Sequence, residues 1–209
     1  MDSYNSAVVT GSLVGPIKED HAVYGETFYS GAIKVNRLSG ASDTLLITIP
    51  GRLLGFLNPE TLASPIEVNG NVRSYSKLVD GHNRMYVTLF AKSIVPADGN
   101  DAHNDAHLTG TICKQPTYRV TPFGREICDL MVAVNRRFDK SDYIPCIVWG
   151  RNALWASHLN VGDHVSLAGR LQSREYDKLT DWGEYVTRTA YELSAYMIER
   201  AVEEVKEIL

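Results

Sequence analysis

The stretch Val132-Ala-Val-Asn-Arg-Arg-Phe138 contains the tripeptide Val-Asn-Arg, which also occurs 99 residues earlier as Val35-Asn-Arg37. The same shift aligns further identities without a gap: Thr10-Gly11 with Thr109-Gly110, Gly51-Arg52 with Gly150-Arg151, Gly70 with Gly169, and Tyr86-Val-Thr88 with Tyr185-Val-Thr187. Chance matches would drift in register, and these do not. Because self-similarity at a fixed spacing marks a repeated structural unit, we predict two copies of one module, in residues 1–98 and 105–196.

Each copy is predicted to be rich in β-strands. Apolar or alternating runs of strand length lie between turn-forming residues; in the second copy they are Ile127–Val134, Tyr143–Trp149, His164–Leu171 and Tyr185–Leu193. One short helix fits between the third and fourth strands, at Gly51–Leu57 and Arg151–Leu159. Gly70 and Gly169 suit a point where a strand bends to close a barrel. The predicted fold class is therefore all-β with minor helix: two tandem OB-folds, each a five-stranded Greek-key barrel.

Two segments flank the second module. Residues 96–105 are rich in turn formers and lack apolar periodicity, which is typical of a linker. Beyond the second barrel, Ile198, Val202, Val205 and Leu209 recur at helical spacing. This spacing predicts an amphipathic helix with one apolar stripe over Ala195–Leu209, assigned as a separate C-terminal element of residues 197–209.

Composition excludes several classes of protein. With 44% hydrophobic and 22% charged residues the chain can bury a core, which argues against disorder. No apolar run approaches the length of about 18–20 residues that crosses a bilayer, and no secretory signal is visible at the N-terminus. Cys113, Cys128 and Cys146 are too few and too widely spaced for a disulfide framework. We expect a cytoplasmic protein that has no contact with a membrane.

Catalytic motifs are not found in the sequence. It contains no phosphate-binding loop, dinucleotide fingerprint or nucleophile elbow. His103 and His107 stand four residues apart, but no cysteine lies at a ligand spacing from them. We therefore predict a protein that is not an enzyme and that uses neither a metal ion nor a cofactor. A third alternative, an OB-fold domain of a nuclease or ligase, has no candidate catalytic residues in this sequence.

The charge of the chain is unevenly distributed. The formal net charge is −4, but residues 110–180 hold ten Lys and Arg against seven Asp and Glu, a local charge of +3. Residues 181–209 hold three against seven, a local charge of −4. Aromatic residues alternate with the Lys and Arg residues of the second module. Cations that track phosphates, interleaved with flat rings on which bases stack, are what sequence-tolerant binding of a single strand requires.

A comparison of the two copies separates exposed rings from core rings. An aromatic residue on a strand is more often buried than exposed to a ligand. At the positions 99 residues earlier, however, the first copy lacks the rings: it has Ser39 for Phe138, Thr44 for Tyr143, Pro50 for Trp149 and Lys77 for Tyr176. We therefore predict that these rings lie on the surface and serve a function that only the second module has. Tyr86 and Tyr185, which match under the shift, are assigned to structure.

Four consecutive motifs of the second module carry a resemblance to a known family. They are Leu108-Thr-Gly-Thr-Ile with Pro116-Thr-Tyr-Arg-Val-Thr-Pro-Phe-Gly124, Val132–Phe138, Ile144-Pro-Cys-Ile-Val-Trp-Gly-Arg151, and Gly169-Arg-Leu-Gln-Ser-Arg-Glu-Tyr176. In this order and spacing, residues 105–196 resemble the bacterial single-stranded DNA-binding protein family. Tyr185-Val-Thr187 resembles the last strand of that family.

The resemblance implies a set of DNA-binding residues. The implied stacking rings are Phe138, Tyr143, Trp149 and Tyr176. The implied basic side chains are Arg119, Arg136, Arg151, Arg170 and Arg174. Two further residues are predicted from the sequence without the resemblance. They are Arg137, beside Phe138, and Trp182, at the tip of a long predicted hairpin. Because members of the family bring four OB-folds together, the resemblance also implies a homodimer of this two-module chain. It further implies a location in the bacterial nucleoid.

The leading hypothesis is a sequence-tolerant binder of single-stranded DNA that acts in replication, recombination or repair, with the first module as scaffold and oligomer interface. Replication or recombination proteins are possible further partners. The alternative is a protein-interaction module of a replication or primosome-like assembly with weak DNA binding. Quenching of tryptophan fluorescence by a thymidine oligonucleotide would distinguish the two hypotheses.

Overall fold

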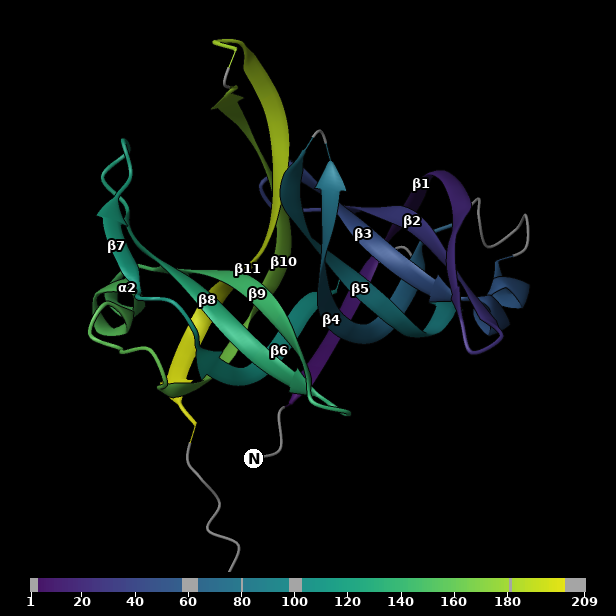
Figure 1. The fold of residues 1–209 in the computed structure, drawn as a ribbon, viewed down its shortest axis with the longest axis horizontal. Helices are drawn as coiled ribbons and strands as arrows, with labels where there is room; N and C mark the ends of the chain where they lie inside the picture. The colour runs from purple at the N-terminus through teal and green to yellow at the C-terminus, as the bar shows by residue number, and fades with distance from the viewer. Residues whose placement is uncertain (1–3, 58–63, 80, 98–102, 181, 202–209) are drawn as a thin grey trace, which may run out of the picture.

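The computed structural model describes residues 4–57, 64–79, 81–97, 103–180 and 182–201. Strands make up nearly all of its regular structure, which confirms the all-β prediction (Figure 1). The elements are, in chain order, β1 (Asn5–Val23), β2 (Glu26–Asn36), β3 (Ser42–Pro50), the 3₁₀ helix η1 (Gly51–Phe56), β4 (Ile66–Val79), β5 (His82–Pro96), β6 (Asn104–Ile112), β7 (Thr117–Val120), β8 (Glu126–Arg136), β9 (Lys140–Trp149), α2 (Arg151–Ala156), β10 (His164–Leu179) and β11 (Tyr185–Arg200).

Strand pairing closes a ring in each half of the chain. In the first half, residues 5–96, β1 pairs with β2, β2 with β3, β3 with β5, β5 with β4, and β4 again with β1. In the second half, residues 104–200, the pairs β6–β8, β8–β9, β9–β11, β11–β10 and β10–β6 follow the same order. Each half is thus a closed β-barrel, and β7 is an extra short strand on β8.

The alternating sequence pattern sets the inner face of each barrel. In β3 the side chains of Asp43, Leu45, Ile47 and Ile49 are buried, while Thr44 between the first two is exposed. The glycines predicted at strand bends lie at register shifts, Gly70 in the β4–β5 ladder and Gly169 in the β10–β11 ladder. A Cβ at either glycine would collide with a backbone carbonyl of the facing strand.

The last strand departs from the repeat of 99 residues. Gly70 lies opposite Ala91, whereas Gly169 lies opposite Ala195, so the strands β5 and β11 correspond with a shift of 104 residues. The difference arises in the hairpins: Val79 pairs with His82, three residues on, but Lys178 pairs with Val186, eight residues on. The sequence match of Tyr86 with Tyr185 is therefore not a structural equivalence.

The helix predicted for Ala195–Leu209 is wrong at residues 195–200. These residues form the end of β11, where Ile198 lies opposite Leu167 and is buried, so an apolar residue that suited a helix stripe serves a sheet instead. Residues 202–209 lie outside the described part of the chain. The two short helices lie where predicted, although both end earlier. No helix within the described ranges is long and apolar enough to cross a membrane.

An antiparallel pair of strands joins the two halves. In the β1–β6 ladder Ala7 lies opposite Ala106, its own equivalent under the shift of 99 residues. Asn5 opposite Leu108 and Val9 opposite Asn104 are related in the same way, because each pair maps onto the other under that shift. The junction therefore has an approximate two-fold axis, as in a symmetric dimer whose interface uses the same patch twice.

Buried aspartates cross this junction in both directions, and we call the two sets of contacts the aspartate clasp. Asp43 Oδ1 of the first half accepts the backbone N–H of Ser173, 2.8 Å away in the second half. Asp142 Oδ1 of the second half accepts the backbone N–H of Ser74 at the same distance. Both carboxylates are fully buried. The serine hydroxyls complete the exchange by accepting N–H groups beside each aspartate, those of Thr44 and Tyr143.

An arginine of the same half balances each buried carboxylate. Arg37 donates two hydrogen bonds to Asp43, of 2.7 and 2.5 Å, and Arg136 Nε lies 3.0 Å from Asp142. Burial raises the pKa of Asp142, and the Ser74 N–H, Arg136 and Arg73 oppose this shift. A buried carboxylate without such partners would carry a large desolvation penalty.

The clasp lies at the base of two long hairpins that rise on the same side of the molecule (Figure 1). We call residues 75–79 and 82–86 of the β4–β5 hairpin the first arm, and residues 174–179 and 185–190 of the β10–β11 hairpin the second arm. Ser74 and Ser173, the serines of the clasp, each precede an arm directly. The clasp therefore sets the position of one arm relative to the other.

Replacing Asp43 with Ala should lower the free energy of unfolding by about 3–5 kcal/mol, because Arg37 and the Ser173 N–H then lose a buried acceptor. Urea denaturation followed by circular dichroism measures the change. Glu175→Ala, at an exposed position of β10, is the control and should change the free energy by less than about 0.5 kcal/mol. Equal effects of the two substitutions would contradict the structural role of the clasp.

Candidate nucleic-acid interface

A cavity of about 720 Å³ opens beside the second half, and we call it the arginine cavity. Its functional side chains are Arg37, Arg125, Trp149, Arg170, Arg174 and Tyr196. Among the described residues, no Asp or Glu side chain lines it. Arg37 already pairs with Asp43, so the guanidinium groups of Arg125, Arg170 and Arg174 are the ones that make this cavity a binding place for an anion.

Trp149, the last residue of β9, is held at the edge of this cavity. Its indole Nε1 donates a hydrogen bond of 3.0 Å to Ser194 Oγ of the neighbouring strand β11, which fixes the ring. The ring is only half-buried, and with Arg125 it also borders a second hollow next to β7. Trp149 thus borders open space on two sides, and a planar group can reach the ring.

The arginines reach the cavity from different elements. Arg170 and Arg174 project from β10, and Arg125 comes from the turn before β8. Arg174 lies 3.7 Å from Glu192 and remains half exposed, so this contact leaves much of its guanidinium accessible. Arg37 comes from the first half, where the clasp already orients it through Asp43. The cavity is therefore built by both halves of the chain.

Three of these residues are not among those predicted from the sequence: Arg37, Arg125 and Tyr196. The repeat contains a signal for Arg37, because Arg37 is the equivalent of Arg136, a predicted binding residue. Both arginines pair with a buried aspartate at the junction, but of the two only Arg37 also lines the arginine cavity of the opposite half. Nothing in one sequence indicates that a side chain serves the site of the other module.

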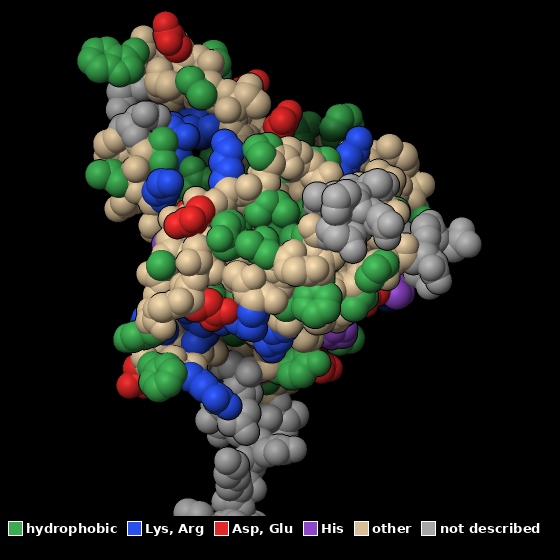
Figure 2. Space-filling view, turned by 90° about the vertical axis from the view of Figure 1, so that its right-hand side faces the viewer, with side chains coloured by type: hydrophobic (Ala, Val, Ile, Leu, Met, Phe, Trp, Pro, Cys, Tyr) green, Lys and Arg blue, Asp and Glu red, His purple; other side chains and the backbone are tan. Residues whose placement is uncertain are grey.

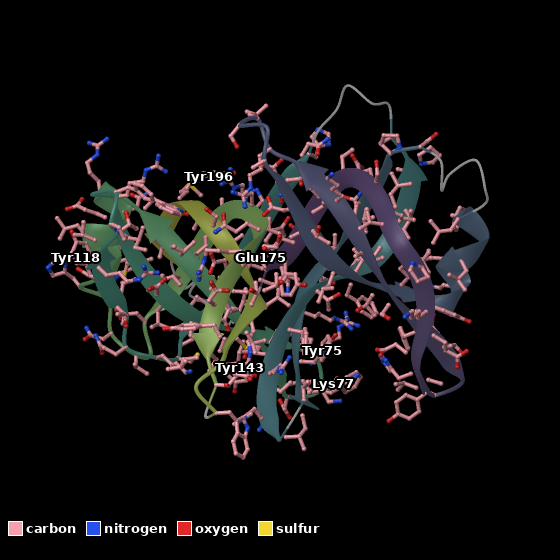
Figure 3. The ribbon with its side chains drawn as sticks, turned by 90° about the horizontal axis from the view of Figure 1, so that it is seen from above. Tyr75, Lys77, Tyr118, Tyr143, Glu175 and Tyr196 are labelled. Carbon is pink, nitrogen blue, oxygen red and sulfur yellow. The ribbon has the colours of Figure 1, made fainter. Side chains whose placement is uncertain are left out.

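The predicted rings are exposed but not gathered in one place. Phe138 lies in the turn between β8 and β9, 90% exposed, with a φ of +64° that is unusual for a bulky side chain. Trp182 lies in the turn between β10 and β11 and is 92% exposed. Tyr143 is half exposed beside the first arm, where Figure 3 shows it near Tyr75 and Lys77.

The remaining predicted residues fall into two groups. Arg137 and Arg151 are exposed, at the β8–β9 turn and at the start of α2, and neither lines the arginine cavity. Arg119 on β7 donates two hydrogen bonds to Asp129, of 2.6 and 3.2 Å, which occupy its guanidinium edge. Tyr176 lines a separate cleft between the two arms.

Among the described residues, no group of three or more His, Cys, Asp or Glu side chains could hold a metal ion. The three cysteines are unpaired, and burial raises the pKa of each thiol, to about 11 in Cys128. At neutral pH these thiols stay protonated, so they are poor nucleophiles and poor metal ligands. The chemistry that the described surface offers is that of cations and rings.

Comparisons with known proteins agree with this surface. The chain is 34% identical over 96 residues to single-stranded DNA-binding protein 2 of Clostridium acetobutylicum, an alignment that covers 43% of this chain and 72% of the relative. It is 34% identical over 91 residues to the single-stranded DNA-binding protein of Clostridium tetani, covering 40% and 63%.

A solved structure shares the fold over the whole chain. The single-stranded DNA binding protein from Thermus aquaticus matches with a TM-score of 0.73 at 22% identity, covering 97% of this chain and 95% of that one. The family model described as the single-strand binding protein family matches residues 103–200. With the cluster of arginines and rings on this half, the chain belongs to the single-strand binding protein family.

Proposed function

We propose that this chain binds single-stranded DNA without sequence preference, in replication, recombination or repair. The observation that carries the proposal is the arginine cavity, with four guanidinium groups and the half-buried ring of Trp149 in one wall. A chain of phosphates needs cations, and the bases of an unpaired strand need flat partners. The model of the single-strand binding protein family matches residues 103–200, the half that supplies most of the residues lining this cavity.

The side chains divide between the two parts of the ligand. Arg125, Arg170 and Arg174 contact phosphates, and Trp149 stacks on a base, whereas Arg37 contributes less because it already pairs with Asp43. Arg125 and Arg170 are exposed, Arg174 is half exposed, and Trp149 uses only its Nε1 for a hydrogen bond. No bond is made or broken in this function, so a catalytic group is not required.

The exposed rings extend the path of the strand beyond the cavity. Phe138, Tyr143 and Trp182 stack on further bases, and Arg137 and Arg151 contact further phosphates. Tyr196 belongs to the cavity itself. Arg136 and Arg119 contribute less than the sequence suggested, because Asp142 and Asp129 already pair with them.

The proposal includes the arrangement of the modules. Residues 1–98 and 105–196 are tandem OB-folds, supported by the identical pairing order of their strands. The first is mainly scaffold: Figure 2 looks onto its face and shows hydrophobic side chains in the middle, with basic side chains in separate groups above and below. A second copy of the chain would cover this apolar area and bring four OB-folds together.

Trp149→Ala should weaken binding of a thymidine oligonucleotide about tenfold or more, since a stacked base contributes about 1–3 kcal/mol. Fluorescence anisotropy with a labelled oligonucleotide measures the Kd. Trp155→Ala, which changes a tryptophan of α2 outside the cavity, is the matched control and should leave the Kd within about twofold.

The same titrations at several salt concentrations test the cations. Arg170→Gln should reduce the slope of log Kd against log salt concentration by about 0.7, which corresponds to one phosphate contact with a single strand. Wild-type protein whose affinity does not change with salt, or a Trp149→Ala variant that binds as well as the Trp155→Ala variant, would refute the proposed site.

Multi-angle light scattering should give the mass of two chains at micromolar concentration. The measurement is made on the full chain, with and without a thymidine oligonucleotide. The mass of one chain under both conditions would contradict the proposed homodimer, while leaving the DNA-binding proposal untouched.

A further inference from the structure

A cleft of about 480 Å³ lies between the two arms, and we call it the inter-arm cleft. One wall is formed by residues 83–86 of β5, in the first arm, and the other by residues 187–190 of β11, in the second arm. Tyr176 and Lys178 of β10 also line it. Its volume lies within the range of about 300–1,000 Å³ that is usual for ligand sites.

The cleft lies across the approximate two-fold axis of the chain. Arg84 pairs with Lys77, and Arg188 pairs with Tyr176, the residue 99 positions after Lys77. Arg84 and Arg188 are therefore structural equivalents that approach the cleft from opposite halves. The corrected register makes Tyr86 the equivalent of Ala190 rather than of Tyr185, which removes the reason for assigning Tyr86 to a shared structural role.

Aromatic rings enter the cleft from both arms. Tyr86 stacks on Tyr75 with ring centroids 5.4 Å apart and planes 18° apart, so its partner holds it in position. Tyr176 comes from the opposite arm, and the guanidinium carbon of Arg174 lies 5.7 Å from the centre of its ring. Two rings that their own neighbours position can stack on a base with little loss of side-chain entropy.

Positive charge exceeds negative charge around these rings. Among the described residues, Lys178, Arg188 and Arg84 line the cleft together with one carboxylate, that of Glu192. The Nε of Arg188 is buried and has no hydrogen-bond partner among the described residues. A buried donor without an acceptor destabilises the protein, and a ligand with an anionic or carbonyl oxygen would supply the acceptor.

The inter-arm cleft also continues the path from the arginine cavity. Arg174 lines the cavity, and Tyr176 and Lys178 line the cleft. Alternate residues of a strand lie on one face, about 6.6 Å apart. A strand that leaves the cavity along this row of β10 therefore arrives in the cleft.

We propose that the inter-arm cleft binds a nucleotide of the same single strand, with its base against Tyr86 and Tyr176 and its phosphate against Lys178 and Arg188. The first module then contacts DNA directly through Tyr86 and is not only a scaffold. This inference rests on the proposed function and adds to it a contact that both halves of the chain provide.

Photocrosslinking of the full wild-type chain to a thymidine oligonucleotide that carries 5-iodouracil tests the contact. Fragmentation mass spectrometry should place crosslinks on Tyr86 and Tyr176 as well as in the arginine cavity. Crosslinks in the cavity without any on Tyr86 would overturn the inference and leave the proposed function standing. The absence of any crosslink and of any binding would instead overturn the proposed function.

Three substitutions provide an independent measurement. Tyr86→Leu should weaken oligonucleotide binding about tenfold, and Tyr86→Phe, which keeps the ring, should bind like the wild type within about twofold. Tyr4→Leu, at an exposed tyrosine of the first half outside the cleft, is the matched control and should not change the Kd. Circular dichroism shows whether each variant is folded. A folded Tyr86→Leu variant with wild-type affinity would refute the contact.

Discussion

The buried carboxylates of Asp43 and Asp142 each bind the backbone of the opposite half of the chain, and the rest of the architecture depends on this exchange. Each carboxylate accepts the N–H of a serine that directly precedes a long arm. Because a fully buried carboxylate has few acceptable partners, the contact tolerates little sliding of one barrel against the other. The β1–β6 ladder adds directional hydrogen bonds to the same junction. Together they fix both arms and the surface around them.

An approximately symmetric backbone carries side chains that are not symmetric. Arg37 and Arg136 occupy equivalent positions and pair with equivalent aspartates, yet only Arg37 has an arginine-rich cavity beside it. At the equivalent of Trp149 the first half has Pro50, and at the equivalent of Arg170 it has Asn71. The two halves thus share a backbone frame, and the side chains of the second half supply most of the charge and the rings. Because the clasp holds the two halves side by side, residues of both can line one binding surface.

The sequence predicted the all-β fold, the positions of both short helices and the glycines at the strand bends, because these depend on local pattern and on spacing within one copy. It failed where an insertion or a contact between the copies decided the outcome. The longer β10–β11 hairpin shifts the last strand by five residues relative to the repeat of 99, and a chance match of Tyr86 with Tyr185 concealed it. Residues 195–200 pair with β10 although their spacing suits a helix. Arg37 was missed because its site belongs to the other half.

If the aspartate clasp holds the two arms in one arrangement, the distance between the arms has a single value. Spin labels at Lys77 on the first arm and Glu175 on the second, both exposed, measure this directly by double electron–electron resonance, after Cys113 is replaced by Ser. We expect one narrow distance distribution, which becomes broad when Asp43 and Asp142 are both replaced by Ala. A broad distribution in the protein with both aspartates intact would contradict this expectation.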